Sequence, residues 1–146
     1  MNKYMNLIGQ NAKKASLEKV NTSVKNKILK RYALLLDEER NLIIKENVKD
    51  IKFAQKKRLK NNLIDRLAIG HNELDNIRNS INKITKLKDP VDNILEKWSR
   101  PSGLKIKKVS IPIGVIGVIY ESRPNVTSDV ASLCFKSGNA VILKGG

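Results

Sequence analysis

The last third of this chain constrains the fold most strongly, because two apolar runs enclose a helical segment. Residues 113–120 read IGVIGVIY, and residues 140–144 read AVILK. Continuous Val and Ile runs of this length are typical of parallel strands that are buried on both faces. Between them, Pro124 suits the first turn of a helix, and Gly138 suits its end. The pattern predicts a right-handed β-α-β unit and therefore an α/β fold.

A polar cluster follows the first of these strands. In open α/β sheets ligands bind beyond the carboxyl ends of the strands, and a helix start favours an anion. Arg123 could clamp a phosphate or carboxylate, and Asn125 could donate a hydrogen bond to a developing oxyanion. Two plainer interpretations stay open: Arg123 could pair with Glu121 or Asp129, and Asn125 could merely cap the helix. The cluster consists of Tyr120, Glu121, Ser122, Arg123, Pro124 and Asn125.

The second apolar run also ends in residues suited to a nucleotide. Lys144 is followed by Gly145 and Gly146. A lysine there could reach the hydroxyl or phosphate groups of a nucleotide, and glycines let the backbone approach a ligand closely. The GxGxxG fingerprint of dinucleotide-binding loops is absent, so these residues alone leave a nucleotide-sized ligand an open hypothesis.

The first ninety residues show helical spacing of apolar side chains. A first helix could be capped by Ser23, and Gly70 is expected as the C-cap of a short helix over NNLIDRLAI. Asp89-Pro90 should end the last helix of this region. The three predicted apolar stripes are Val24, Ile28, Tyr32, Leu35 and Leu36; Leu42, Ile44, Val48 and Ile51; and Leu74, Ile77, Ile81, Ile84 and Leu87.

Between the helices and the β-α-β unit, the pattern changes to alternation. The run LEKWSRPSGLKIKKVSI alternates around Pro101-Ser102-Gly103, which is a turn signal between two extended arms. A β-hairpin is therefore predicted. The chain divides into a helical region over 1–90, a hairpin over 91–112 and the β-α-β unit over 113–146.

Composition narrows the classes of function. The net charge of +15 over 146 residues permits a basic helical module that binds nucleic acid. Against it, the lysines are spread through every helix, and aromatic residues for base stacking are only 4%. Neither a secretory signal nor a run of about 20 apolar residues for a membrane helix is visible. One cysteine fits the reducing cytoplasm, and one Cys with one His cannot build a metal site.

The most specific signal is the amino-acid sequence of the last segment. VIYESRPNVT followed by KSGNAVILKGG closely resembles the glutamate-5-semialdehyde dehydrogenase (γ-glutamyl phosphate reductase) family of the aldehyde dehydrogenase superfamily. The upstream runs IDRLAI, LKDPVDNILEKW and RPSGLKIKKVSIPIGVIGV resemble the family in the same order. An aldehyde dehydrogenase of other substrate remains an alternative, but those enzymes carry a Pro-Trp-Asn type turn where this chain has YESRPN.

The resemblance implies a fold and a reaction. The family reduces γ-glutamyl phosphate with NADPH to glutamate 5-semialdehyde and phosphate, the second step of proline biosynthesis. A cysteine forms a thioester, and hydride transfer releases the aldehyde. The resemblance further implies a Rossmann-like NADP-binding domain that starts at residue 113, a hairpin arm used in homo-oligomer contacts, and a functional link to glutamate 5-kinase.

The resemblance also assigns residues. Residues 120–125 should line the crevice for cofactor and substrate, with Lys144 and Gly145 near the adenosine ribose of NADP(H). Asn125 is the candidate oxyanion donor, while Glu121 and Arg123 carry no individual role. The nucleophilic cysteine of the family lies downstream of Gly146, and Cys134 is expected to be a buried, inert thiol. The chain therefore resembles the N-terminal third of a longer enzyme, and we expect it to be inactive alone.

Overall fold

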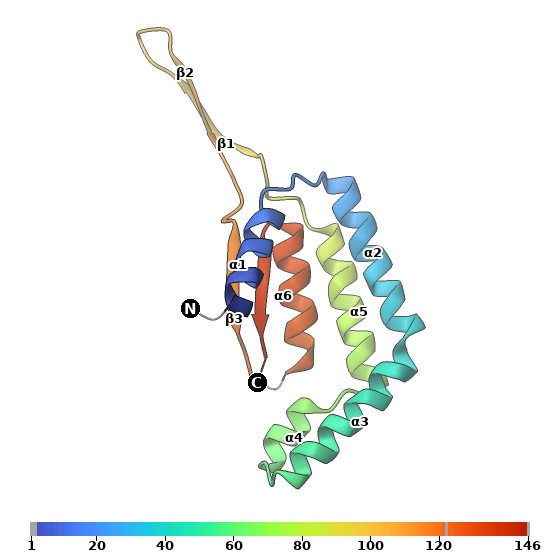
Figure 1. Ribbon diagram of the computed structural model, residues 1–146. Coiled ribbons are helices and arrows are strands. Elements are labelled where there is room, and N and C mark those ends of the chain that lie inside the picture. The colour runs from blue at the N-terminus through green and yellow to red at the C-terminus, as the bar shows by residue number, and fades with distance from the viewer. Residues whose placement is uncertain (1–2, 122, 146) are drawn as a thin grey trace.

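The computed structural model describes residues 3–121 and 123–145, which form six helices and four strands (Figure 1). The helices are α1 (Lys3–Ala15), α2 (Thr22–Glu38), α3 (Arg40–Lys56), α4 (Asn61–Leu67), α5 (His71–Lys86) and α6 (Pro124–Lys136). The strands are β1 (Ile94–Ser99), β2 (Lys105–Val109), β3 (Val115–Ile119) and β4 (Ala140–Lys144). As predicted from the sequence pattern, the first ninety residues form helices, and all four strands lie after them.

The hydrophobic core lies where α5 packs between α2 and α6 (Figure 1). The stripe predicted on α5 is confirmed for Leu74, Ile77, Ile81 and Ile84, which are all buried, whereas Leu87 lies past the helix end and is exposed. Burial of each such side chain stabilises the fold by about 1.5 to 3 kcal/mol. Helix α5 is therefore the central element against which the others are arranged.

The stripe predicted on α2 is confirmed only in part, because Tyr32 and Leu36 pack against the hydrophobic core and the other three residues do not. The helix is capped by Asn21, whose side-chain oxygen accepts a hydrogen bond from the Val24 amide at 2.9 Å, so it begins before the predicted cap Ser23. The buried side chains of α2 are Lys25, Leu29 and Ala33, whereas the predicted Val24, Ile28 and Leu35 are exposed. Helix α2 thus has two apolar faces, and α5 covers the face of Leu29 and Ala33, which also carries Lys25.

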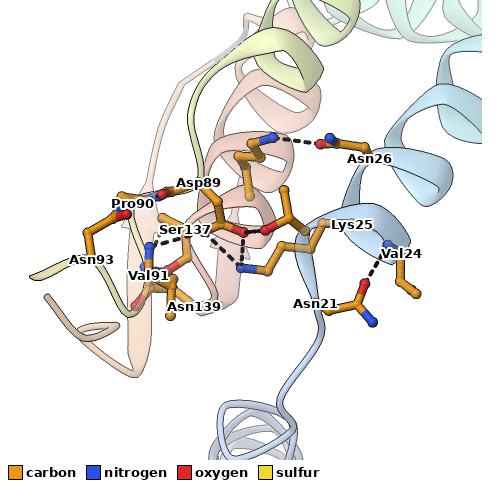
Figure 2. Close-up of polar contacts among 12 residues, drawn as sticks. Asn21, Val24, Lys25, Asn26, Asp89, Pro90, Val91, Asn93, Ser137 and Asn139 are labelled. Atoms are coloured by element: carbon orange, nitrogen blue, oxygen red, sulfur yellow. Dashed lines mark hydrogen bonds and ion pairs between the residues drawn. The ribbon is translucent and has the colours of Figure 1, made fainter.

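Two buried lysines connect distant parts of the chain, and Figure 2 shows one of them, Lys25, beside Asp89. The Lys25 side chain is only 3% exposed, and its Nζ lies 2.9 Å from Oδ2 of Asp89, just before the hairpin. Lys136, at the end of α6, donates to Oδ1 of Asn26 at 2.6 Å and to the carbonyl of Thr85 at 3.1 Å. Lys25 is thus ion-paired, whereas the buried ammonium group of Lys136 is satisfied by two neutral hydrogen-bond acceptors.

Helices α3 and α4 form the end of the molecule farthest from the hairpin (Figure 1). Of the stripe predicted on α3, Leu42 and Val48 are exposed, and the buried residues are Asn47 and Ala54. Gly70 does not cap the end of α4, because that helix ends at Leu67, and Gly70 is instead the N-cap of α5. The side chain of Glu73 accepts a hydrogen bond from the Gly70 amide at 2.8 Å, which fixes this helix start.

The predicted hairpin is confirmed. Strands β1 and β2 pair antiparallel, with Trp98 opposite Ile106 and Ser99 opposite Lys105. Gly103 in the turn has a φ of 83°, which favours glycine. The hairpin extends away from the helices as a separate arm (Figure 1). Its side chains are therefore almost all exposed.

The β-α-β unit is confirmed as a parallel pair of strands joined by α6. Val115 lies opposite Ala140 and Ile119 opposite Lys144. Gly138 follows α6 with a φ of 73°, and a Cβ there would lie 3.0 Å from Cγ of Pro112. The prediction that β3 is buried on both faces is wrong for the described residues, because Ile119 is 87% exposed. Helices α1 and α6 both pack against β4, and since the described sheet has two strands, β3 and β4 are both edge strands.

Candidate functional site

The carboxyl ends of β3 and β4 form one polar edge with the first turn of α6. The Tyr120 amide donates to the Lys144 carbonyl at 3.0 Å, so the two strand ends stay in register beyond the ladder. The Tyr120 hydroxyl lies 2.5 Å from Oγ1 of Thr127 on α6. A Cβ added to Gly145 would lie 3.6 Å from the Tyr120 hydroxyl. The Tyr120 ring is thus held between α6 and the chain that leaves β4.

Arg123 lies at this edge, and its guanidinium has no hydrogen bond or ion pair to the described residues. It is the N-cap of α6, its amide donates to the Glu121 carbonyl at 2.9 Å, and Pro124 takes the first helical position as predicted. The side chains of Arg123 and Glu121 are exposed, and neither forms an ion pair within the described residues. The alternative in which Arg123 pairs with Glu121 or Asp129 is therefore not what this structure has. Ser122, also predicted here, lies outside the described residues.

The Asn125 side chain is turned along α6. Its Nδ2 donates to Oδ2 of Asp129 at a long 3.4 Å, and the other oxygen of Asp129 accepts from Oγ of Ser80 at 2.7 Å. Arg123 and not Asn125 is the N-cap, so the interpretation of Asn125 as the helix cap is wrong. A donor role toward a ligand requires the Asn125 amide to leave Asp129, and that role stays a prediction.

Lys144 closes the other end of the polar edge. Its side chain is exposed, and its ammonium group donates to the carbonyl of the adjacent Gly145. Within the described part of the chain it has no carboxylate partner. Both cationic side chains of the edge, Arg123 and Lys144, are therefore available to an anionic or polyhydroxylic ligand.

Two cavities flank Arg123 and Pro124. One of about 660 Å³ separates them from the α4–α5 segment, and one of about 500 Å³ separates them from α3 and reaches Tyr120 and Gly145. These volumes are in the range of small-molecule sites. The sequence predicted the β3 side of these cavities but missed the opposite wall, because no motif links residues 65–77 to the strand tip. That wall carries Arg66, Glu73 and Asn76.

Sequence comparison with known proteins shows which proteins this chain is related to. No protein-family model matches the chain. The chain is 52% identical over 127 residues to the gamma-glutamyl phosphate reductase of Nautilia profundicola and 51% identical over 130 residues to that of a Hydrogenobaculum species. It covers 31% and 30% of those two proteins. The chain is a homologue of gamma-glutamyl phosphate reductase.

Solved reductase structures agree with this relationship. The crystal structure of the gamma-glutamyl phosphate reductase from Thermotoga maritima superposes on 94% of this chain with a TM-score of 0.90 at 40% identity. The reductase from Saccharomyces cerevisiae superposes on the whole chain with a TM-score of 0.92 at 32% identity. The resemblance read from the sequence is thus confirmed in sequence and in structure.

The homology covers part of the reductases. The chain spans about a third of the length of the curated reductases that it matches, and 34% and 38% of the two solved reductase chains. This coverage is consistent with an N-terminal segment of such an enzyme. The division at residues 90 and 112 stays a prediction.

Cys134 lies away from the polar edge, in the second half of α6. It is 7% exposed, and burial raises the pKa of its thiol. A buried thiol with a raised pKa is a poor nucleophile, as the sequence predicted for this residue. His71, the one histidine, is the first residue of α5 and is exposed.

Two further features bear on function. Across residues 3–121 and 123–145, no group of three or more His, Cys, Asp and Glu side chains could hold a metal ion. None of the helices in these ranges is long and apolar enough to cross a membrane.

Proposed function

We propose that this chain is part of an NADPH-dependent enzyme that reduces γ-glutamyl phosphate to glutamate 5-semialdehyde and phosphate, in proline biosynthesis. The observation that carries the proposal is the homology to gamma-glutamyl phosphate reductases in sequence and structure. On this proposal, β3, α6 and β4 begin a Rossmann-like cofactor domain. The cytoplasm is the expected location, since the single cysteine suits a reducing compartment.

The polar edge fits a dinucleotide phosphate. Arg123 and Lys144 are cationic, exposed and without carboxylate partners in the described chain, and they stand at the carboxyl ends of adjacent parallel strands. Arg123 also begins α6, where the helix dipole favours an anion. We therefore assign residues 120–125, together with Lys144 and Gly145, to the cofactor and substrate crevice. When bound, NADPH supplies the hydride that reduces the acyl group.

Asn125 has the chemistry for the oxyanion. It projects from the first turn of α6, and its 3.4 Å contact with Asp129 is too long to hold the amide firmly. A substrate carbonyl that gains negative charge would accept a shorter hydrogen bond from that amide than the Asp129 carboxylate does. Cys134 is not the nucleophile of this proposal, because it is buried with a raised thiol pKa. We therefore expect the 146-residue chain to be inactive without the rest of a reductase.

A chimaera tests the proposed function. Residues 1–146 are joined to the remaining two thirds of the Nautilia profundicola reductase in place of the segment that they match. The assay follows NADPH formation from glutamate 5-semialdehyde, phosphate and NADP⁺, the reverse of the proposed reaction. We expect activity from the chimaera and none from the 146-residue chain. A folded but inactive chimaera would refute the proposal.

Matched variants show whether the polar edge takes part. Arg123→Gln and Lys144→Gln should raise the KM for NADP⁺ or phosphate by about tenfold, the cost of one charge-assisted contact. Arg31→Gln is the control, since Arg31 lies on exposed α2 surface in an ion pair with Glu38. If all three variants behave alike, the assignment of the edge to the cofactor and substrate is wrong.

We propose that the hairpin makes homo-oligomer contacts. It extends from the body, and it exposes apolar side chains that include Trp98 and Leu104. Replacing both by Glu should shift the chimaera to a lower oligomeric state in sedimentation velocity experiments. An unchanged sedimentation coefficient would show that the hairpin is not an interface. The link to glutamate 5-kinase stays a prediction and rests on the phosphorylated substrate that such a kinase makes.

A further inference from the structure

The α4–α5 wall, which faces the polar edge, carries charged side chains of its own. The cavity of about 660 Å³ lies between α4–α5 on one side and the start of α6 on the other. The α6 side contributes Arg123, Asn125 and Asp129. The α4–α5 side contributes Asp65, Arg66 and Glu73, so groups of both charges face one space. A ligand that fits such a cavity carries both an anionic and a cationic group.

Arg66 is an available cation at this wall. It lies in the last turn of α4 and is exposed, and within the described residues its guanidinium has no hydrogen bond or ion pair. By contrast, Arg40 and Arg78 are ion-paired to Asp37 and Asp75. A free guanidinium that lines a cavity can take a carboxylate with two parallel hydrogen bonds.

Glu73 is an oriented anion at the same wall. Its Oε2 accepts from the Gly70 amide at 2.8 Å, which fixes the carboxylate at the start of α5. Oε1 takes part in no hydrogen bond to the described residues. A carboxylate can accept several hydrogen bonds, so the same side chain can cap α5 and bind an ammonium group.

A buried asparagine holds the segment that joins these two residues. Asn47 on α3 is 4% exposed, its Nδ2 donates to the Leu67 carbonyl at 3.0 Å, and its Oδ1 accepts from the Ile69 amide at 2.8 Å. Residues 67–69 lie between Arg66 and Glu73. The wall is therefore preformed, which lowers the entropic cost of binding.

We propose that Arg66 binds the α-carboxylate and Glu73 the α-ammonium group of the substrate, and that these two residues determine specificity for an amino-acid substrate. The proposal rests on the proposed function, which places the reacting carbonyl of the same molecule at Asn125, a residue that lines the same cavity. The substrate then spans the cavity from the α4–α5 wall to the polar edge. Charged side chains stand on both walls of that cavity.

The test uses the chimaera with three aldehydes. Glutamate 5-semialdehyde carries both α groups, glutaric semialdehyde lacks the ammonium group, and 4-aminobutanal lacks the carboxylate. Arg66→Gln should raise the KM for the first two by about tenfold to a hundredfold and leave that for 4-aminobutanal nearly unchanged. Glu73→Gln keeps an oxygen for the Gly70 amide, and it should raise the KM for glutamate 5-semialdehyde and 4-aminobutanal but not for glutaric semialdehyde. The KM for NADP⁺ should not change.

The outcomes separate the two proposals. A folded, unmodified chimaera without activity refutes the proposed function and this inference with it. An active chimaera in which Arg66→Gln and Glu73→Gln change the three aldehydes equally, or not at all, refutes this inference alone. Arg31→Gln, which alters an exposed arginine on α2, is the control and should leave every KM at the unmodified value.

Discussion

The guanidinium of Arg40 lies 2.5 Å from Oδ1 of Asp37 and thereby connects the start of α3 to the end of α2. The same guanidinium reaches Asp75 on α5 at 2.6 Å, and Arg78 reaches Asp37 at 3.0 Å. Two arginines and two aspartates therefore form a closed ring of alternating charge. This ring fixes α3 relative to α5, and it thus sets the position of the wall that faces the polar edge.

Because of this ring, we expect the stability of the fold to depend on pH in the acidic range. Hydrogen bonds from Arg40 and Arg78 lower the pKa of Asp37 below its ordinary value of 3.8. Because the folded-state pKa is the lower one, the stabilisation is complete above about pH 4 and is lost as the pH falls through the lowered pKa. We expect the urea midpoint of the chain to decrease over that range, and Asp37→Asn to flatten the decrease.

Glu46→Gln is the matched control for this measurement. Glu46 pairs with Lys49 at 2.7 Å, but both side chains are more than half exposed, so the pair contributes little. An acid profile that is the same for Asp37→Asn, Glu46→Gln and the unmodified chain would show that the ring does not stabilise the fold.

Removing one partner of the buried pair between Lys25 and Asp89 should be costly. Burial acts to raise the pKa of Asp89, but hydrogen bonds from Lys25, the Val91 amide and Thr22 outweigh it and lower the pKa. Lys25→Met leaves that carboxylate without its cation, and the free energy of unfolding should fall by about 3 kcal/mol. Urea denaturation measures the loss. Asp89→Asn added to Lys25→Met should recover part of it, and a further loss of similar size would contradict the pairing.

Asn47 should control the order of the segment between α4 and α5. Asn47→Ala removes the partner of the Leu67 carbonyl and of the Ile69 amide, at a cost of about 1 to 3 kcal/mol. Hydrogen exchange at the Ile69 amide should accelerate strongly. Asn47→Asp keeps the acceptor for that amide and should exchange at an intermediate rate. Equal rates in all three proteins would mean that Asn47 does not hold the segment.

Cys134 should react slowly with thiol reagents. Burial raises the pKa of the thiol, so little thiolate is present near neutral pH, and access is restricted. The chain has one cysteine, so a disulfide reagent reports on this residue alone. We expect slow labelling in native buffer and rapid labelling in urea. Rapid labelling of the folded chain would contradict the buried position, and Cys134→Ala should leave the activity of the chimaera intact.

Periodicity predicted the buried face of α5 correctly except for Leu87, but it predicted the buried face of α2 only at Tyr32 and Leu36, and the difference has a physical reason. On α5 the apolar residues form one face, so there is a single way to bury them. On α2, Val24 and Ile28 compete with Leu29 and Ala33, and the second face wins although it includes Lys25. Its ammonium group is stabilised by Asp89, which lies 64 residues away in the sequence. A local pattern contains no information on such a partner.

The candidate site was predictable on one side only. Residues 120–125 follow an apolar strand, so their position at the strand tip follows from the topology of a β-α-β unit. Arg66 and Glu73 face them across a cavity because α3 and α4 fold back toward α6, and no spacing in the sequence indicates that approach. The hydrogen bond between Asn125 and Asp129 was equally hidden, since it depends on a side-chain rotamer.

The hydrogen bond between Lys136 and Asn26 has a consequence for synthesis of the chain. The two residues are 110 positions apart, and Lys136 is buried only when α6 has packed against α2. At about 5 to 20 residues per second, α2 is synthesised about 5 to 20 seconds before α6. During that interval its apolar faces lack this partner. During translation, α2 can therefore pack against α5 before the contact between Lys136 and Asn26 can form.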